Sequence, residues 1–231
     1  MNDSPNGILL IDKPAGMSSF GVVARVRRIL SQQVGKKVKV GHAGTLDPFA
    51  TGLLIILVGT ACKEADRFLK LDKSYDATMV LGQTSSTGDP EGELHTVSEL
   101  VPTKATIEAA LSQFRGVIAQ TPPIFSAIKI NGQRAYALAR KGQDVAMPTR
   151  QVRIDRLELT TYDYPKVALS CDVVSGTYIR SLVSDIGEQL TTGAYTGQLR
   201  RTRIDRYDVQ RAITISDDTA AKKLIDNLQP L

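Results

Sequence analysis

The architecture depends most on residues 41–58, which read GHAGTLDPFATGLLIILV. Residues 53–58 form an uninterrupted apolar run, which is typical of a strand buried on both faces. The residues before it contain three glycines, which permit positive φ and close backbone approach, around the pair Asp47-Pro48. The sequence therefore predicts a tightly turned loop that leads into a core strand.

Strands and helices are predicted on both sides of this stretch. Residues 7–12 are typical of a buried strand that ends at Lys13-Pro14, and Ser18 or Ser19 can N-cap the helix that follows. That helix would bury an apolar stripe made of Val22, Val23, Val26, Ile29 and Leu30. Further strands are expected at 37–40, 75–81, 152–159 and 167–173, helices near 61–70, 106–114, 135–141 and 178–190 (the last N-capped by Thr177), and a hairpin around Asn131-Gly132.

These elements do not follow a strict βαβ rhythm. The predicted fold class is therefore α+β, with a mixed, mostly antiparallel sheet and flanking helices. Residues 122–150 are basic and rich in turn signals, so we expect them to form an excursion from this core.

The composition excludes several classes of protein. A chain of 231 residues, 42% of them hydrophobic, can bury a core without a disulfide or a metal. Its apolar runs fall far short of the roughly 20 residues that a membrane-spanning helix needs, and its polar N-terminus shows no secretory signal. Cys62 and Cys171 have no metal-ligand spacing, and the only histidines are His42 and His95. We therefore expect a reduced, cytoplasmic protein without a zinc or haem site.

Charge is segregated along the chain, which has a net charge of +5. Residues 25–39 hold six basic side chains and no acidic one, and residues 200–206 hold four arginines. Residues 84–100 instead hold four acidic side chains and no Lys or Arg. This pattern predicts a face that binds a polyanion, although solvated surfaces would give the same pattern about as often.

Two positions could carry chemistry. Asp-Pro pairs commonly open turns, and on spacing alone this structural role for Asp47 is the more frequent one. No Gly-Lys-Ser/Thr ending follows, so the loop is not a nucleotide-binding P-loop. Arg180 falls in the first turn of a predicted helix, where the macrodipole disfavours a cation by roughly 0.3–1 kcal/mol. Arg180 therefore either has an anionic partner, a carboxylate or a phosphate, or is exposed without a role.

Residues 41–52 closely resemble the signature loop of the tRNA pseudouridine-55 synthases, the TruB family. Five further motifs resemble those of the family and follow in its order, so that the resemblance covers residues 7 to about 215. They are 12–19 (DKPAGMSS), 73–75 (KSY), 126–129 with 136–140 (SAIK and YALAR), 176–182 (GTYIRSL) and 199–201 (LRR).

The resemblance implies an isomerase that converts the T-loop uridine at position 55 of tRNA to pseudouridine, without a cofactor or a metal. It also implies a monomer that binds the tRNA T arm and needs no protein partner. Residues 1–231 would form one catalytic domain, in which the insertion at about 122–150 clamps RNA. The small RNA-binding (PUA-type) domain that commonly follows in the family is expected to be absent, because the chain ends about sixteen residues after Ile215.

The same resemblance implies roles for individual residues. Asp47 matches the nucleophile, which attacks the uracil ring or C1′ or acts through a glycal, and Arg180 matches its cationic partner. A cation beside a carboxylate holds the pKa of that carboxylate low. Tyr75 matches the residue that stacks on the flipped uracil. His42, Tyr178 and Leu199 match positions that enclose the flipped nucleotide, and the RNA backbone is expected to contact Lys13, Lys129, Arg140, Arg200 and Arg201.

Two other classes of function remain open. The chain could bind or refold RNA without modifying it, or it could be an unrelated basic α+β protein. The presence of Asp47, Tyr75 and Arg180 together favours the enzyme, because a binding protein gains nothing from a carboxylate facing RNA. Substrates other than tRNA also remain open.

Overall fold

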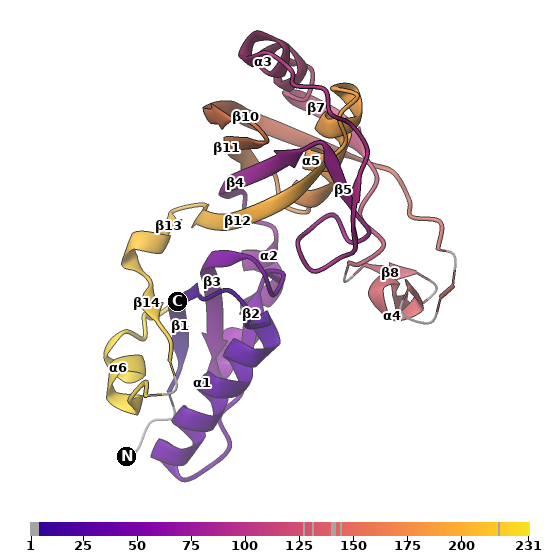
Figure 1. The fold of residues 1–231 in the computed structure, drawn as a ribbon. Coiled ribbons are helices and arrows are strands. Elements are labelled where there is room, and N and C mark those ends of the chain that lie inside the picture. Colours follow the sequence, from indigo (N-terminus) through magenta and orange to yellow (C-terminus); the bar gives the residue numbers. More distant parts are fainter. Residues whose placement is uncertain (1–4, 127, 131, 140–141, 144, 217) are drawn as a thin grey trace. The chain divides into compact units, whose positions relative to one another are not determined.

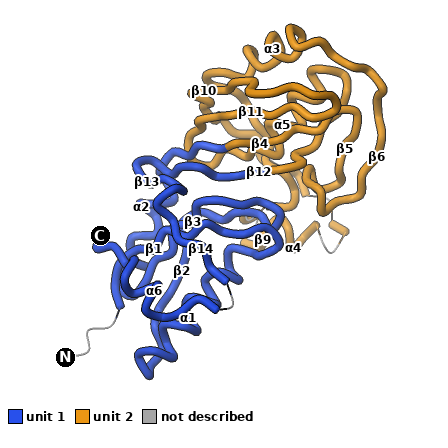
Figure 2. Tube along the Cα trace, turned by 60° about the vertical axis from the view of Figure 1, so that its left-hand side comes forward, with its two compact units in different colours: residues 1–75, 199–231 blue, residues 76–198 orange. Residues whose placement is uncertain are grey.

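The computed structural model of the protein describes residues 5–126, 128–130, 132–139, 142–143, 145–216 and 218–231 (Figure 1). The chain divides into two compact units, which are coloured separately in Figure 2. Unit 1 comprises Met1–Tyr75 and Leu199–Leu231, and unit 2 comprises Asp76–Gln198. The strands β4 (Lys73–Leu81) and β12 (Ala194–Ile204) each contain residues of both units.

Unit 1 is built around β3 (Thr51–Val58), the core strand predicted from the apolar run. β3 pairs antiparallel with β1 (Gly7–Lys13) and β2 (Val40–Ala43), and parallel with β12. Every side chain from Leu53 to Val58 is completely buried. The remaining elements of unit 1 are α1 (Ser19–Val34), η1 (Gly59–Glu64), α2 (Ala65–Leu69), β13 (Tyr207–Asp208), η2 (Val209–Arg211), β14 (Ile213–Thr214) and α6 (Ala221–Asp226).

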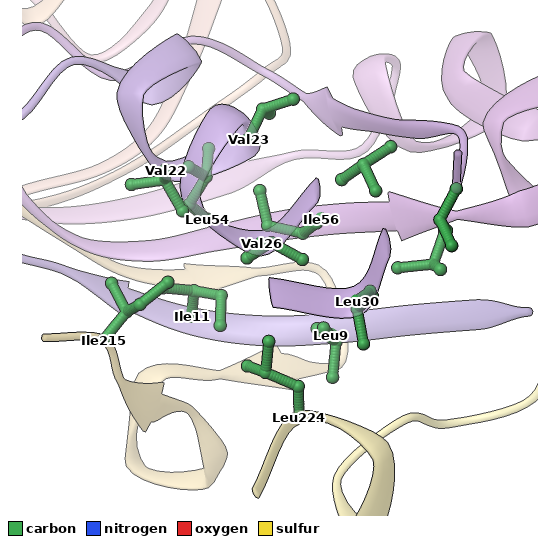
Figure 3. Close-up of a cluster of buried hydrophobic side chains, with 13 residues drawn as sticks. Leu9, Ile11, Val22, Val23, Val26, Leu30, Leu54, Ile56, Ile215 and Leu224 are labelled. Carbon is green, nitrogen blue, oxygen red and sulfur yellow. The ribbon is translucent and has the colours of Figure 1, made fainter. Parts of the chain in front are cut away.

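Two hydrophobic clusters form on opposite faces of these strands, because successive strand residues point to opposite sides. On one face, α1 packs its apolar stripe against β1 and β3, as Figure 3 shows. On the other face, η1 and α2 contribute Ala61 and Phe68. The first cluster contains Leu9, Ile11, Val22, Val23, Val26, Leu30, Leu54, Ile56, Ile215 and Leu224.

Unit 2 is a largely antiparallel sheet with helices. The strand order is β12-β4-β11-β10-β7, and β10 pairs antiparallel with both β11 and β7. The helix α3 contacts β10 and α5. The elements of unit 2 are β5 (Gln83–Ser85), β6 (Leu94–Thr96), α3 (Lys104–Ser112), β7 (Gly116–Gln120), β8 (Lys129–Ile130), β9 (Gln133–Arg134), α4 (Ala135–Ala139), β10 (Arg150–Asp163), β11 (Lys166–Val173) and α5 (Ile179–Gln189).

The predicted fold class is confirmed. Antiparallel pairs dominate, β1 pairs parallel with β14 and β12 with β3, and helices flank the strands. Ser18 is the N-cap of α1, and its hydroxyl accepts the Gly21 N–H at 3.0 Å. The strands β7 and β10, which flank the predicted excursion at 122–150, are paired neighbours in the sheet.

Several local predictions were wrong. The expected strand at 37–40 begins only at Val40, and the expected helix near 61–70 is a 3₁₀-helix followed by a short α-helix. The N-cap of α5 is Tyr178, not Thr177, and no side chain caps that end. The longest omission is β12, which no predicted element covered.

Two further predictions concern the organisation of the chain. The division into compact units does not test a single catalytic domain over 1–231, so that organisation stays a prediction, as does the absence of a following RNA-binding domain. In the described part of the chain, no helix is long and apolar enough to cross a membrane.

Candidate active site

The loop that carries Asp47, residues 44–50, connects β2 to β3. The Asp47 carbonyl accepts the Ala50 N–H at 3.2 Å, which closes the turn after Pro48. The Asp47 side chain is half-buried. The predicted turn is therefore present, and Asp47 lies in it. The chemistry open to the Asp47 carboxylate depends on the residues around the loop.

The main chain on both sides of Asp47 is held by side chains from β1 and α1. The Lys13 ammonium group, fully buried at 0% exposure, donates to the Pro48 carbonyl at 3.1 Å and to the Met17 carbonyl at 2.7 Å. The Ser19 hydroxyl accepts the Leu46 N–H at 2.8 Å and donates to the Leu46 carbonyl at 3.0 Å. The residues directly before and after Asp47 are therefore fixed through their backbone atoms.

Arg201 of β12 fixes both ends of the loop. Its guanidinium donates to the carbonyls of Gly44 at 3.0 Å and Leu53 at 2.7 Å. Gly52 has φ +101°, and a Cβ there would lie 2.3 Å from the Arg201 carbonyl oxygen. Only glycine therefore allows the loop to approach β12 this closely.

Lys13 and Arg201 were predicted to contact RNA phosphates, and the structure contradicts this prediction. Lys13 is fully buried and Arg201 is 1% exposed, so neither lies on a surface that a phosphate can reach. Burying a charge is costly unless hydrogen bonds satisfy it, and the loop carbonyls do so here. Both residues position the loop instead of binding RNA.

Arg200 and Lys129 lie at the surface, so their predicted contacts with RNA stay predictions. The Arg200 guanidinium forms two hydrogen bonds with the Asp12 carboxylate, at 2.8 and 3.0 Å, while its side chain remains 40% exposed. Lys129 is exposed in β8. Arg140 lies outside the described residues.

Three other predicted site residues lie in unit 1 with Asp47. His42 is half-buried in β2, where it faces Ile56 of β3 in the strand register. Tyr75 of β4 and Leu199 of β12 are both buried at 8% exposure. Their predicted contacts with a flipped nucleotide stay predictions.

Arg180 lies in unit 2, in the first turn of α5, and it has the anionic partner that its position demanded. Its guanidinium lies 3.3 Å from a carboxylate oxygen of Asp89, and both side chains are buried. It also donates to the carbonyls of Thr87 at 2.7 Å and Phe125 at 2.8 Å. Pairing of Arg180 with Asp47 stays a prediction.

Asp89 is the partner of Arg180 in the structure, and the sequence analysis missed it. Its other carboxylate oxygen accepts hydrogen bonds from the Thr87 hydroxyl at 2.6 Å and the Glu91 N–H at 3.1 Å. These two bonds fix the orientation of the carboxylate toward Arg180. The available signal was the acidic segment 84–100, but nothing in the sequence distinguishes Asp89 from its three acidic neighbours.

Tyr178 begins α5 and is held by a glutamine from β7. Its N–H donates to the Gln120 side-chain oxygen at 2.8 Å, and the Gln120 amide donates back to the Tyr178 carbonyl at 3.1 Å. The Arg150 guanidinium lies 5.1 Å from the centre of the Tyr178 ring, which is within range of a cation–π interaction. These contacts stabilise the position of the ring, and neither Gln120 nor Arg150 was predicted.

Lys73, two residues before Tyr75, has a perturbed pKa. Burial and the nearby charge of Arg201 lower the pKa of Lys73 to about 8, against a smaller opposing effect of Asp72. The ammonium group donates to the carbonyls of Leu69, at 2.8 Å, and Leu71. Among the described residues, no group of three or more His, Cys, Asp or Glu side chains could hold a metal ion.

Comparison with known proteins gives a consistent family assignment. Residues 27–179 match the N-terminal domain of the TruB family of pseudouridylate synthases, and residues 180–229 match the C-terminal domain of tRNA pseudouridylate synthase B. The tRNA pseudouridine synthase B of Pseudomonas putida is 43% identical over 212 residues, which cover 92% of this chain and 68% of that protein. The Mycobacteroides abscessus protein of the same name is 46% identical over 217 residues, which cover 91% of this chain and 71% of that protein.

Solved structures agree in fold. A chain of a Cbf5-Nop10-Gar1 complex superposes with a TM-score of 0.73 at 28% identity, over 98% of this chain and 60% of that chain. A chain of an H/ACA RNP bound to a substrate RNA containing 2′-deoxyuridine superposes with a TM-score of 0.68 at 24% identity, over 100% of this chain and 65% of that chain. This chain therefore spans less than two thirds of the length of each of these two chains.

Proposed function

The chain belongs to the TruB family of pseudouridylate synthases, whose tRNA members isomerise uridine to pseudouridine, and we propose that it does so with Asp47 as nucleophile. The target is the T-loop uridine at position 55. The protein acts in the cytoplasm as a monomer on the T arm of tRNA, without a cofactor or an obligatory protein partner.

The observation that carries this proposal is the way the Asp47 loop is held. Lys13, Ser19 and Arg201 hold backbone atoms of the loop before and after Asp47. A nucleophile gains most when its position is fixed before the substrate arrives, because the ordering cost is then not part of the reaction barrier. A loop with no reaction to support would not need three buried anchors.

The reaction rearranges one glycosidic bond. The bond between N1 of uracil and C1′ of ribose breaks, the base rotates, and a bond between C5 and C1′ forms. C5 loses its proton to water and N1 gains one, so the atoms balance without an oxidant or a reductant. Asp47 attacks the ring or C1′, or promotes a glycal, and all three routes need an ionised carboxylate at this position.

The remaining site residues act on the flipped uridine. A base must leave its stack before an enzyme can reach its glycosidic bond, and an aromatic ring replaces part of the lost stacking. Tyr75 supplies that ring, His42, Tyr178 and Leu199 enclose the nucleotide, and Arg180 is the cationic partner of Asp47. The buried Asp89 orients Arg180 through the 3.3 Å ion pair.

Recognition of the T arm relies on loop shape and on phosphate contacts. Phosphate contacts position an RNA without reading its sequence, whereas unpaired loops are recognised by their shape. Arg200 and Lys129 are accessible for such contacts, and residues 122–150 form the clamp on the arm.

The test uses a T-arm RNA hairpin with tritium at C5 of its uridines, because formation of the new carbon–carbon bond releases that tritium to water. The wild type should release tritium over many turnovers. Asp47→Asn keeps the shape of the side chain but removes its charge, so it should release none while binding the hairpin within about twofold of the wild type. Asp226→Asn is the matched control, because Asp226 is exposed on α6.

One outcome would contradict the proposal. If the wild type binds the hairpin and whole unmodified tRNA tightly but releases no tritium from either, the protein binds or refolds RNA and does not modify it. Equal release by the wild type and Asp47→Asn would instead remove Asp47 from the reaction.

A further inference from the structure

Phe20 exposes an unusually large apolar surface for a residue in a helix. It is the second residue of α1, and 66% of it is accessible. The helix does not need the ring for its own start. Ser18 caps the N-terminus, and Met17 packs against the hydrophobic cluster that contains Val22, which is the pairing expected of a hydrophobic staple.

The position of Phe20 is tied to the Asp47 loop. Its neighbour Ser19 makes both hydrogen bonds to Leu46, the residue directly before Asp47. Phe20 therefore stands at the helix turn that anchors the loop, and both features lie within unit 1.

A cation lies beside the ring. The Arg27 guanidinium is 5.9 Å from the centre of the Phe20 ring, and it donates to the Val40 carbonyl at 3.0 Å, which anchors it. Ala24 is exposed one turn along the helix from Phe20, and its methyl group is too small to cover the ring. An aromatic face with an arginine next to it is thus accessible on the outer side of α1.

The segment that carries the ring is basic. Residues 13–46 contain seven lysines and arginines and no acidic residue; Lys13 is buried, and Arg27 lies beside the ring. An exposed aromatic ring on a basic surface is the combination by which proteins bind unpaired nucleotides, because the base stacks on the ring and the cations attract the phosphates. A protein partner of acidic or apolar character would not need a planar ring at this one position.

We propose that Phe20 is a stacking platform for an unpaired base of the RNA loop, next to the uridine that Asp47 attacks. This inference rests on the proposed function, which supplies the RNA. Phe20 then acts as a positioning residue: it holds the neighbouring nucleotide while the target base is out of the stack, and it does not touch the reacting atoms.

A direct test is available because the chain contains no tryptophan. Phe20→Trp places a single fluorophore at the platform, in an Asp47→Asn background that prevents turnover. Binding of the T-arm hairpin should quench its fluorescence, since a stacked base quenches tryptophan. A duplex with the same stem and no loop should leave it unchanged. Ile225→Trp in the same background is the control, because Ile225 is 41% exposed on α6 and should not respond to the hairpin.

Kinetics provide the second readout. Phe20→Ala should raise KM for the hairpin roughly 5- to 150-fold, the range that stacking of one base gives on alanine substitution. The value of kcat should change less than threefold, Phe20→Trp should restore KM, and Ile225→Ala should match the wild type.

Failure of this inference and failure of the proposed function give different results. An unquenched Phe20→Trp signal with hairpin bound, equal quenching by the duplex, or an unchanged KM in Phe20→Ala would each overturn the platform. Loop-specific quenching in the Asp47→Asn background, together with no tritium release by the wild type, would support the platform and overturn the enzyme.

Discussion

Ser18 and Ser19 are consecutive residues with the same side chain and different tasks. Ser18 caps α1 by accepting the Gly21 N–H, and Ser19 holds the main chain before Asp47 through Leu46. Loss of the Ser18 hydroxyl removes one hydrogen bond at the start of α1. Loss of the Ser19 hydroxyl removes the hydrogen-bond partner of the Leu46 N–H and carbonyl in the loop. The two serines therefore form a matched pair for separating stability from activity.

Ser18→Ala should lower the free energy of unfolding by about 1 kcal/mol, the usual value of an N-cap, with less than a threefold loss of kcat. Ser19→Ala should cost about 1–3 kcal/mol and reduce kcat at least tenfold, because the loop loses two hydrogen bonds beside the nucleophile. Urea unfolding and tritium release measure the two quantities. Equal losses of kcat in both variants would show that the Ser19 bonds do not position the loop.

Residue-level prediction failed where burial decides the role of a side chain. The assignment of Asp47 as nucleophile came from the resemblance of its loop to the family motif, and it stays a prediction. Lys13 and Arg201 were assigned to the RNA because a lone sequence describes them only as basic. Their real role depends on strand register, which places their side chains under the loop, beside its backbone carbonyls. Asp89 was missed for the same reason.

At the scale of an element, the helix α5 contains, besides the buried Arg180, a partly buried ionisable residue, Asp185. Burial, reinforced by the charge of Glu188, raises the pKa of Asp185 from its ordinary value of 3.8 to about 6. Between these two pH values the folded state binds more protons than the unfolded state, so stability falls as pH rises. Above about pH 6 the whole penalty of the buried charge is present.

Asp185→Asn should therefore stabilise the protein at pH 7.5 by about 1–2 kcal/mol, because the amide carries no charge to desolvate and solvent screening at this partly exposed position reduces the full effect of the pKa shift. The advantage should shrink to a few tenths of a kcal/mol near pH 3.5, where the wild-type carboxyl is protonated in both states. Urea unfolding of both proteins across this pH range gives the curve. A constant difference at every pH would mean that the charge of Asp185 is not its cause.

Elements with clear periodicity were predicted well, and β12 shows why others were not. In β12, buried Leu199 and Arg201 alternate with the partly exposed Arg200. In the sequence an arginine is taken as an exposed position, so the alternation of buried and exposed residues that marks a strand could not be recognised in β12. The helix α5 also buries an arginine, Arg180, but only in its first turn; the apolar residues Leu182, Val183 and Ile186 continue at helical spacing after it, and the body of the helix lies within the predicted range.

At the scale of the whole molecule, the segregated charge implies a salt-dependent affinity for RNA. Contacts with about five phosphates would give a slope of roughly −4 for log affinity against log salt concentration. The exposed Lys129 should contribute to it, so Lys129→Gln should reduce the slope by just under 1. Lys13→Met should leave the slope unchanged while lowering stability, because Lys13 is buried.

Titration of the hairpin at several salt concentrations measures these slopes. A nearly flat dependence for the wild type would contradict a phosphate-binding surface. A smaller slope in Lys13→Met would show that Lys13 contacts a phosphate, although its side chain is buried in the free protein.

The fold class followed from the mixture of strands and helices, and the family followed from six motifs in order. The division into two compact units did not follow, because β4 and β12 contain residues of both and no linker composition marks the boundary. A boundary that falls inside strands leaves no trace in the local sequence.

The turn formed by Ser18, Ser19 and Phe20 has a consequence for how this chain can change over time. Ser18 precedes the helix in extended backbone and caps it, while Ser19 and Phe20 are its first two residues, about 100° apart around the axis, so that one holds the loop and the other exposes its ring. A substitution at one of them alters one of these contacts. An insertion or deletion between these residues would disturb more than one of these contacts at once, so we expect this segment to keep its length among descendants of the chain even where its composition varies.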